Sequence, residues 1–325
     1  MTIARQTLGT HAARTAGVWL LVLPGAVWAA VRAGGWERGP LVQLFAFTPY
    51  VAAGAWGPAL AAALSRRWLA AAVGLSSAAV LSMSMLPRMR ADRRGPLDGV
   101  DLSLMTANLL KGAAEPAAVV ELIRRHDVAV LALQEFTPAA QIALKAAGLE
   151  MLMPYSSLAP AEDPSGSALY SRFPITEAGV RSNAGGFQQA YGTVQPPDAG
   201  PIRVESAHTM APFNIAALPG WRADLEIQPR PDPDGPPRIL VGDFNATLDH
   251  QPLRALIAHG YRDAAETVGA GLIGTWGPYD GRLIPPVTID HVLVDRRIGV
   301  RDAAVHNLPG SDHRAIVAAL FVPAA

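Results

Sequence analysis

The sequence predicts an α+β domain built on β-sheets, preceded by a membrane anchor of about three helices. Three observations lead to this fold class. Long uncharged stretches crowd the first 90 residues. From residue 101 onward, short apolar runs of four to eight residues recur between polar or turn residues, which is typical of strands. Between some of these runs lie stretches whose apolar residues repeat with helical spacing.

The uncharged stretches predict membrane-spanning helices at about residues 15–33, 40–64 and 67–87. Between their flanking arginines they hold 17, 27 and 20 residues, and a span needs roughly 20. Five of the seven tryptophans fall here, several near the stretch ends, as interfacial anchors do. Core helices of a soluble protein, or a cleaved signal peptide for the first stretch, are the alternatives. Three such stretches in succession leave almost no polar face, which favours the anchor.

Charge divides the chain in the same place. Residues 88–100 are charged and contain Gly and Pro, so we expect a linker there, followed by a soluble domain at 101–325. Residues 100–325 hold 17 basic and 24 acidic residues. An acidic domain is poorly suited to following a nucleic-acid backbone, so nucleic acid is possible as a partner but disfavoured. The absence of cysteine excludes disulfides and a thiolate nucleophile.

Strands predominate in the soluble domain, and helices are predicted between some of them. The strand-like runs are DLSLMTA, VAVLALQ, SALYS, IRVESA, RILVGD, IDHVLVD and AIVAALFV. EPAAVVELIRRHD predicts a helix that begins near Pro116, and HQPLRALIAHG predicts another that begins near Pro252 and ends at Gly260.

Polar side chains follow or precede six of these predicted strands. They are Asn108, Gln134–Glu135, His208, Asp243 with Asn245, Asp290–His291 and Asp312–His313. Strands that each end in a carboxylate, amide or imidazole suggest ends that converge on one rim. Carboxylate and amide oxygens are hard ligands, which suit Mg²⁺ or Mn²⁺.

The order of these motifs, Asn, Gln-Glu, Ser-Arg, His, Gly-Asp-Phe-Asn, Asp-His and Ser-Asp-His, resembles the endonuclease/exonuclease/phosphatase superfamily over about residues 100–322. The resemblance implies a four-layer α/β/β/α sandwich with an active site at one end. It also implies hydrolysis of phosphate esters with a divalent cation, Mg²⁺ or Mn²⁺.

The resemblance assigns metal binding to three residues. Glu135 would be the principal ligand, Asn108 would lie beside it, and Asp312 would be a further ligand of the metal or of its water.

Five catalytic residues are carried over by the same resemblance. Asp243 would handle the attacking water or the leaving group, and Asn245 would donate hydrogen bonds to phosphoryl oxygens. His313 would contact the scissile phosphate, with Asp290 as its carboxylate partner. His208 matches a mid-chain histidine, although its setting, SAHTMAP, departs from the family's usual Thr-His-Leu. His291 is expected to be a supporting or surface residue.

The predicted function is that of a multi-pass, membrane-anchored phosphoesterase acting on a lipid-linked or cell-envelope phosphate or pyrophosphate. Its expected partners are the lipid bilayer and a phosphorylated lipid or small molecule. The architecture is similar to that of teicoplanin-resistance-type bacterial phosphatases, which places the catalytic domain outside the cytoplasm; the arginine count alone places it inside. An extracytoplasmic Mg²⁺-dependent endonuclease and a catalytically inactive binding domain are the alternatives. The intact motif set argues against the latter.

Overall fold

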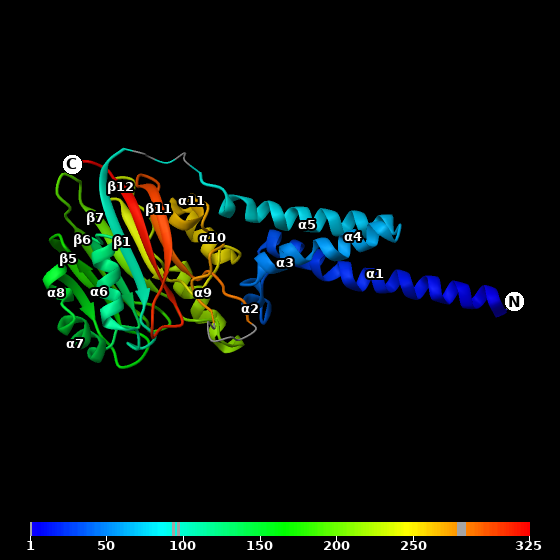
Figure 1. Ribbon diagram of the computed structural model, residues 1–325, viewed down its shortest axis with the longest axis horizontal. Coiled ribbons are helices and arrows are strands. Elements are labelled where there is room, and N and C mark those ends of the chain that lie inside the picture. Colours follow the sequence, from blue (N-terminus) through cyan, green and yellow to red (C-terminus); the bar gives the residue numbers. More distant parts are fainter. Residues whose placement is uncertain (1, 93–94, 96–97, 278–283) are drawn as a thin grey trace. The chain divides into compact units, whose positions relative to one another are not determined.

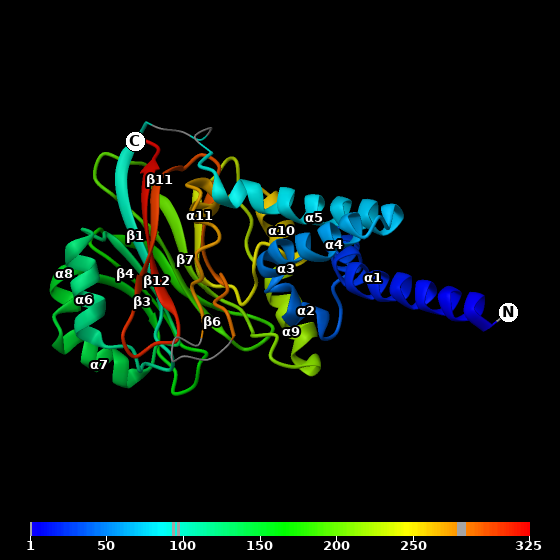
Figure 2. The same ribbon diagram turned by 45° about the vertical axis from the view of Figure 1, so that its right-hand side comes forward.

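The computed structural model describes residues 2–92, 95, 98–277 and 284–325 (Figures 1 and 2). The chain divides into two compact units. One consists of Met1–Leu86 with Asp249–Gln251, and the other of Pro87–Leu248 with Pro252–Ala325. Of the predicted linker at 88–100, residues 93–94 and 96–97 lie outside the described residues.

The first unit is helical. Its elements are α1 (Thr2–Gly34), α2 (Leu41–Phe45), α3 (Thr48–Gly54), α4 (Trp56–Leu64) and α5 (Trp68–Met89) (Figure 1). Within the described part of the chain, two stretches of helix are long and apolar enough to cross a membrane, judged by length and composition alone. They are Ala13–Gly34 and Trp68–Met89.

The middle span predicted at 40–64 is wrong as a single long helix. The structure divides it into α2, α3 and α4, none longer than nine residues. Pro49 stands in the first turn of α3 and Pro58 in the first turn of α4, where a missing backbone N–H costs least. Hydropathy records that this stretch is apolar, but prolines and glycines decide where its helices begin and end.

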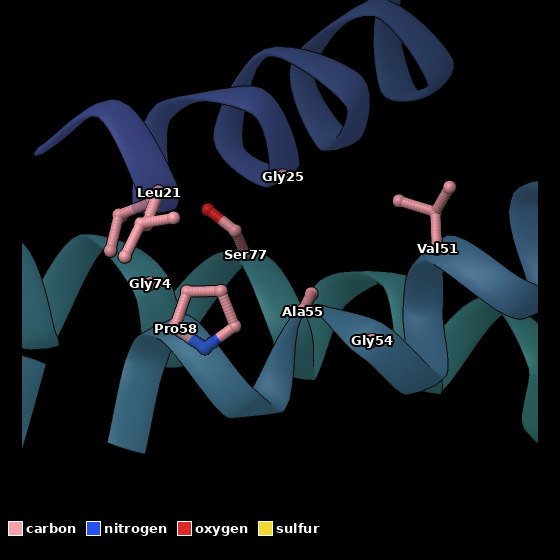
Figure 3. Close-up of a pocket in the computed structure, with 9 residues that line it drawn as sticks. Leu21, Gly25, Val51, Gly54, Ala55, Pro58, Gly74 and Ser77 are labelled. Carbon is pink, nitrogen blue, oxygen red and sulfur yellow. The ribbon is translucent and has the colours of Figure 1, made fainter. Parts of the chain in front are cut away.

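Small side chains let the helices of this unit approach one another. Val22 of α1 packs with Ala62 of α4 and with Ala70 of α5. At Gly74, a Cβ would lie 3.0 Å from Ala59. A cavity of about 190 Å³ remains among these helices, lined by glycines, Pro58, Ser77 and apolar side chains (Figure 3).

The second unit is built on two six-stranded sheets. The first has the strand order β11-β12-β1-β2-β4-β3 and the second β5-β6-β7-β8-β10-β9. The first contains β1 (Val100–Asn108), β2 (Val130–Gln134), β3 (Tyr155–Ala159), β4 (Ser167–Ser171), β11 (Gly299–Asn307) and β12 (Arg314–Val322). The second contains β5 (Ile175–Ser182), β6 (Gln188–Val194), β7 (Ile202–His208), β8 (Arg238–Asp243), β9 (Tyr261–Asp263) and β10 (Asp290–Asp295).

Helices pack against this pair of sheets. They are α6 (Pro116–Arg125), α7 (Pro138–Ala146), α8 (Leu149–Leu152), α9 (Leu218–Glu226), α10 (Gln251–Ala258) and α11 (Ala264–Thr267), with a short 3-10 turn, η1 (Ile215–Ala217). Along β1, Leu104 enters the core between the two sheets, whereas Met105 enters the core that α6 and α7 cover. This alternation follows from the two-residue period of a strand. The predicted α+β sandwich is therefore confirmed as two packed sheets with helices.

The strand directions gather the polar strand ends at one end of the sandwich. β1 and β2 are parallel, as are β7 and β8. β12 runs antiparallel to β1, and β10 antiparallel to β8, so both begin where their neighbours end. Asp243 is consequently in register with His208 on one side and with Asp290 on the other.

Gly242 allows a close approach at this end. It lies inside β8 with φ of +148°, and a Cβ there would come within 2.0 Å of the Ala207 carbonyl oxygen and 2.8 Å of Gln134 Nε2. Gln134 belongs to the opposite sheet and donates from Nε2 to Ser206 Oγ at 2.9 Å. Glycine is therefore needed for the contact between the two sheets beside the site.

We expect Gly242→Ala to lower the free energy of unfolding by about 1–3 kcal/mol, because the backbone must shift to relieve the contact. Denaturation of the full chain followed by near-ultraviolet circular dichroism measures this loss. Gly200→Ala is the matched control, since a Cβ there meets nothing closer than 4.0 Å. Equal stability of the two variants would contradict the packing argument.

Candidate active site

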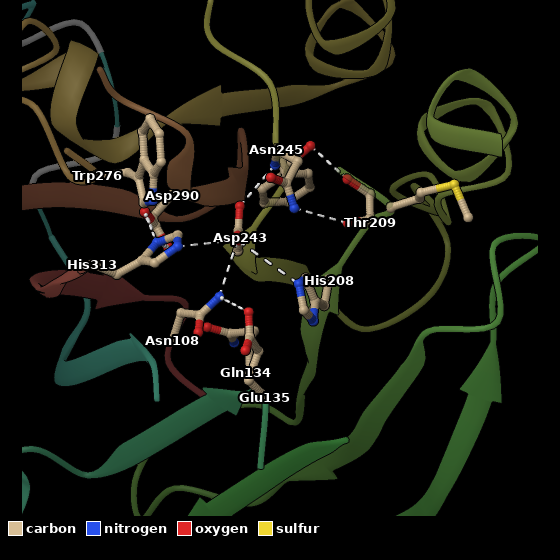
Figure 4. Close-up of polar contacts among 12 residues, drawn as sticks. Asn108, Gln134, Glu135, His208, Thr209, Asp243, Asn245, Trp276, Asp290 and His313 are labelled. Carbon is tan, nitrogen blue, oxygen red and sulfur yellow. Dashed lines mark hydrogen bonds and ion pairs between the residues drawn. The ribbon is translucent and has the colours of Figure 1, made fainter. Parts of the chain in front are cut away.

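Asp243 occupies the centre of the polar cluster at the rim (Figure 4). Its Oδ2 accepts a hydrogen bond from Asn108 Nδ2 at 3.1 Å, and its Oδ1 accepts one from the Asn245 backbone N–H at 2.8 Å. Two imidazoles flank the same Oδ2, His313 Nε2 at 3.7 Å and His208 Nε2 at 3.8 Å. Four other predicted site residues thus meet around the buried carboxylate of Asp243.

Glu135 enters the cluster from the end of β2. Its backbone is in the left-handed region, with φ of +55°. Its Oε1 accepts from Asn108 Nδ2 at 3.3 Å, and its Oε2 accepts from the Lys111 backbone N–H at 2.7 Å. A left-handed conformation is unfavourable for glutamate and persists where the surroundings hold it, as at functional sites. Asn108 therefore bridges the carboxylates of Glu135 and Asp243.

His313 and Asp290 form a charged pair. His313 Nδ1 contacts Asp290 Oδ2 at 2.9 Å and Oδ1 at 3.1 Å, and Thr275 Oγ1 donates to Asp290 Oδ2 at 2.7 Å. Burial opposes the charge on His313, but the carboxylates of Asp290 and Asp243 outweigh it and raise the His313 pKa to about 10. At neutral pH the ring is therefore an imidazolium with Nε2–H directed toward Asp243.

The pKa of His208 is shifted in the opposite direction. Burial, and then the charge of His313, lower its pKa to about 3. The ring packs edge-on against Phe187, with centroids 4.6 Å apart, and Nδ1 has no hydrogen-bond partner among the described residues. The two histidines beside Asp243 are thus a neutral imidazole and a cation.

Burial and the neighbouring Asp290 charge raise the pKa of Asp243 to about 7, although His313 and the Asn245 N–H act in the other direction. A carboxyl group that titrates near neutral pH is suited to accept or return a proton during catalysis.

Asn245 lies just beyond the end of a strand. β8 ends at Asp243, and Asn245 follows in the left-handed region with φ of +47°. Its side-chain Nδ2 donates to the Thr209 carbonyl at 2.9 Å, so that one of its two N–H bonds is engaged. Among the described residues, the other N–H has no hydrogen-bond partner.

Asp312 is held by a contact of its own. Its Oδ2 accepts from Trp276 Nε1 at 2.9 Å, while its buried Oδ1 has no hydrogen-bond partner among the described residues. Within the described ranges it shares no hydrogen bond with Asn108 or Glu135.

The charges of the cluster fit a divalent cation. Across the described residues, none of its four carboxylates forms a salt bridge with Arg or Lys. They are Glu135, Asp243, Asp290 and Asp312. His313 supplies one positive charge, so negative charge is in excess in a largely buried place, which favours a bound cation. Oxygen donors of this kind suit Mg²⁺ or Mn²⁺.

One geometric grouping, Asp243, Asp290 and His313, has ligand atoms within 4.8 Å of one another. A doubly protonated imidazole cannot ligate, so His313 cannot complete this grouping. The carboxylates of Glu135 and Asp243, which Asn108 bridges, therefore fit a cation better than the Asp290–His313 pair does.

His291 is neither a site residue nor a surface residue. It is buried, with Nδ1 at 2.8 Å from Asp263 Oδ2 and Nε2 at 2.9 Å from the Ala246 carbonyl oxygen. Because both partners are acceptors, this geometry requires a proton on each nitrogen. Burial opposes that charge, but the hydrogen bond and charge of Asp263 raise the His291 pKa overall.

Comparison with known proteins identifies the family of this chain. Residues 105–313 match the model of the Endonuclease/Exonuclease/phosphatase family. No curated protein matches the sequence. An endonuclease/exonuclease/phosphatase from Beutenbergia cavernae is similar in structure, with a TM-score of 0.53, 19% identity, and coverage of 69% of this chain and 72% of that chain.

Two structures named TDP2 are similar as well. Truncated TDP2 from Caenorhabditis elegans gives a TM-score of 0.54 at 17% identity, covering 70% of this chain and 100% of that chain. Humanised TDP2 from D. rerio gives 0.55 at 16% identity, covering 68% and 99%. At these identities the likeness concerns the fold.

We expect Asp243→Asn to lower kcat for a chromogenic diester, bis(4-nitrophenyl) phosphate, by about 10²–10³, since the amide cannot take a proton from water. Glu135→Gln should raise the Mg²⁺ concentration needed for half-maximal rate. Asp302→Asn and Glu162→Gln are the matched controls, because both side chains are exposed. Unchanged kcat in Asp243→Asn would remove this residue from the mechanism.

The protonated form of His291 predicts a pH effect on stability. A folded-state pKa above the unfolded value of about 6.5 means that its contribution is fully present below pH 6.5 and is lost as pH rises through the folded pKa. The difference in unfolding free energy between wild type and His291→Gln should therefore be larger at pH 6 than at pH 9. Urea titrations at the two pH values measure it, and a difference that grows with pH would contradict the assignment.

Proposed function

Because the chain belongs to the endonuclease/exonuclease/phosphatase family, we propose that it is a membrane-anchored phosphoesterase that hydrolyses a lipid-linked or cell-envelope phosphate or pyrophosphate, with Mg²⁺ or Mn²⁺. As a family member it is a metal-dependent hydrolase of phosphate ester bonds. One observation carries the choice of substrate: the same chain holds this site and two helices long and apolar enough to cross a membrane.

The side chains divide the work of phosphoryl transfer among them. Asp243 takes the proton of the attacking water, and its raised pKa suits that task. The His313 imidazolium, held by Asp290, donates Nε2–H to a phosphoryl oxygen. Asn245 donates its remaining N–H to another. A divalent cation held by Glu135 and Asn108, with Asp312 as a further ligand, would neutralise charge on the phosphoryl oxygens.

His208 keeps the site polar without adding charge. As a neutral imidazole 3.8 Å from Asp243 Oδ2, it does not neutralise that carboxylate in the way that His313 does. We propose that it limits solvent access to Asp243 on this side.

A loop beside the site suits a substrate with a hydrocarbon part. Phe213 and Ile215 follow His208 along the chain, and their side chains are 70% and 66% exposed. The loop is held at both ends, because the Met210 N–H donates to Asp224 Oδ2 at 2.8 Å and Asn214 Oδ1 accepts from the Ala217 N–H at 2.9 Å. On a loop fixed in this way, the two side chains offer contact to the hydrocarbon part of a substrate.

The same loop disfavours duplex DNA. A nucleic-acid backbone binds basic surfaces, whereas this domain has an excess of acidic residues and apolar side chains near its site. Nuclease activity is therefore the result that would replace the lipid proposal.

We further propose that the catalytic domain lies outside the cytoplasm, on the likeness of its architecture to membrane-anchored bacterial phosphatases. A reporter protein that is active only when exported is fused either at the N-terminus or after residue 95. Its activity shows on which side of the membrane each position lies. Two membrane crossings give the same signal at both positions, and three give opposite signals. A cytoplasmic signal after residue 95 would overturn this placement.

The substrate is decided by one comparison. Full-length protein in vesicles is supplied with Mg²⁺ and either a prenyl diphosphate or supercoiled plasmid. Phosphate release from the lipid supports the proposal. Plasmid nicking without phosphate release overturns it. Absence of activity on both substrates would support an inactive binding domain.

We expect the double substitution Phe213→Ser and Ile215→Ser to raise KM for a lipid phosphate in vesicles by about tenfold, because apolar contact is lost. Hydrolysis of bis(4-nitrophenyl) phosphate should not change, since this small ester lacks a long chain. Ile142→Ser is the matched control: Ile142 lies on α7 and is 71% exposed. If that control reduced lipid hydrolysis equally, the loop would have no special role.

A further inference from the structure

Lysine is rare in this protein. The chain contains two, Lys111 and Lys145, among 27 basic residues. Lys145 Nζ forms a salt bridge with Glu150 at 2.8 Å, on α7 and α8. Lys111 is exposed and follows β1 beside the site, and among the described residues no hydrogen bond or ion pair engages its ammonium group. A cation without a partner therefore stands next to a cluster with excess negative charge.

The backbone around Lys111 has an unusual conformation that other contacts hold in place. Leu110, Lys111 and Gly112 follow one another with φ of +47°, +51° and +77°. Such a run is unfavourable for residues with a Cβ, so other contacts must hold it. Two do so: the Leu110 N–H donates to Asn108 Oδ1 at 3.0 Å, and the Lys111 N–H donates to Glu135 Oε2 at 2.7 Å. The turn is thus tied directly to two predicted metal ligands.

Lys111 lies on one particular side of the cluster. It is bonded to Glu135, whereas Asn245 is bonded to Asp243 and Thr209. Figure 4 shows Glu135 and Asn245 on opposite sides of Asp243. Asn245, which is assigned to the scissile phosphate, therefore lies across Asp243 from the glutamate that the Lys111 backbone contacts.

We propose that Lys111 binds a second phosphate of the substrate, the one that is not attacked, and so makes the site selective for a diphosphate over a monophosphate. The lipid form of this inference rests on the function proposed above. An ammonium group on a flexible stem presents three donors and a full charge, which suit the oxygens of this phosphate. Water attacks the terminal phosphorus, the bridging P–O bond to it breaks, and the prenyl monophosphate, whose phosphate Lys111 holds, is the leaving group, so that orthophosphate is released. It also offsets the repulsion that four carboxylates exert on added negative charge.

Kinetics with matched substrates test this role. The full-length protein, with Lys111→Met, Lys111→Arg and Lys145→Met variants, is assayed on farnesyl diphosphate and farnesyl monophosphate at equal free Mg²⁺. We expect Lys111→Met to raise KM for the diphosphate roughly ten- to hundredfold, as for loss of a charged hydrogen bond, with KM for the monophosphate unchanged. Lys111→Arg should retain most of the diphosphate selectivity, and Lys145→Met should resemble wild type.

A second measurement does not depend on turnover. Amine acetylation of the Asp243→Asn protein, followed by peptide mass spectrometry, reports the two lysines separately. Inorganic pyrophosphate should protect Lys111 more than orthophosphate does, and neither should protect Lys145. Equal protection by the two anions, or none, overturns the proposal.

The outcomes separate this inference from the proposed function. Equal loss on both farnesyl substrates would assign Lys111 to the scissile phosphate or to the fold, and would overturn the inference alone. If the wild type cleaves neither farnesyl ester and nicks plasmid instead, the lipid function fails. Pyrophosphate inhibition of diester hydrolysis, weakened by Lys111→Met and not by Lys145→Met, would then still support a second phosphate subsite; unchanged inhibition would overturn it.

Discussion

The burial of the Asp243 carboxylate is the constraint on which the rest of the site depends. A carboxylate removed from water must be compensated by hydrogen bonds and positive charge. Asn108, the Asn245 backbone and His313 each provide part of that compensation, and they come from different strands of both sheets. The surplus of negative charge that remains is what makes the place suitable for a cation and for a phosphate bound through it.

The same constraint explains how the two sheets meet. Gln134 spans them, accepting from Thr106 Oγ1 at 3.1 Å within its own sheet and donating to Ser206 Oγ in the other. Ser206 Oγ in turn donates to the Leu133 carbonyl at 2.9 Å. This buried polar bridge fits only because Gly242 has no side chain. It ties β2 to β7, the strand next to β8, and so holds Glu135 near Asp243.

Electrostatics gives the two histidines opposite roles from similar positions. Both lie within 4 Å of Asp243, but only His313 has a second carboxylate, Asp290, on its other nitrogen. His313 is therefore charged, and its charge helps to keep His208 neutral. An unpaired cation at Lys111 extends the positive charge beyond this centre. A substrate with more than one phosphate would match that distribution.

Much of this architecture could be predicted from the residues themselves. Continuous apolar runs predicted β1, β2, β4, β7, β8, β10 and β12, and all but β4 have a site residue at or next to an end. The strands that were not predicted include all four sheet edges, β3, β5, β9 and β11. Residues of β5 are mostly exposed, so its sequence lacks the apolar signal that a central strand carries. The broken middle span was misread because hydropathy says nothing of where proline begins a helix.

What the sequence by itself determined is the set of chemical groups and the strand ends that carry them, because a buried strand and its polar terminus are both local patterns. Only the tertiary structure decided which of these groups are charged and which are paired. That His313 is charged and His208 neutral, that His291 is a buried support, and that Lys111 stands unpaired beside Glu135 all depend on neighbours distant in the chain. Protonation and pairing are properties of three-dimensional surroundings, and no local pattern contains them.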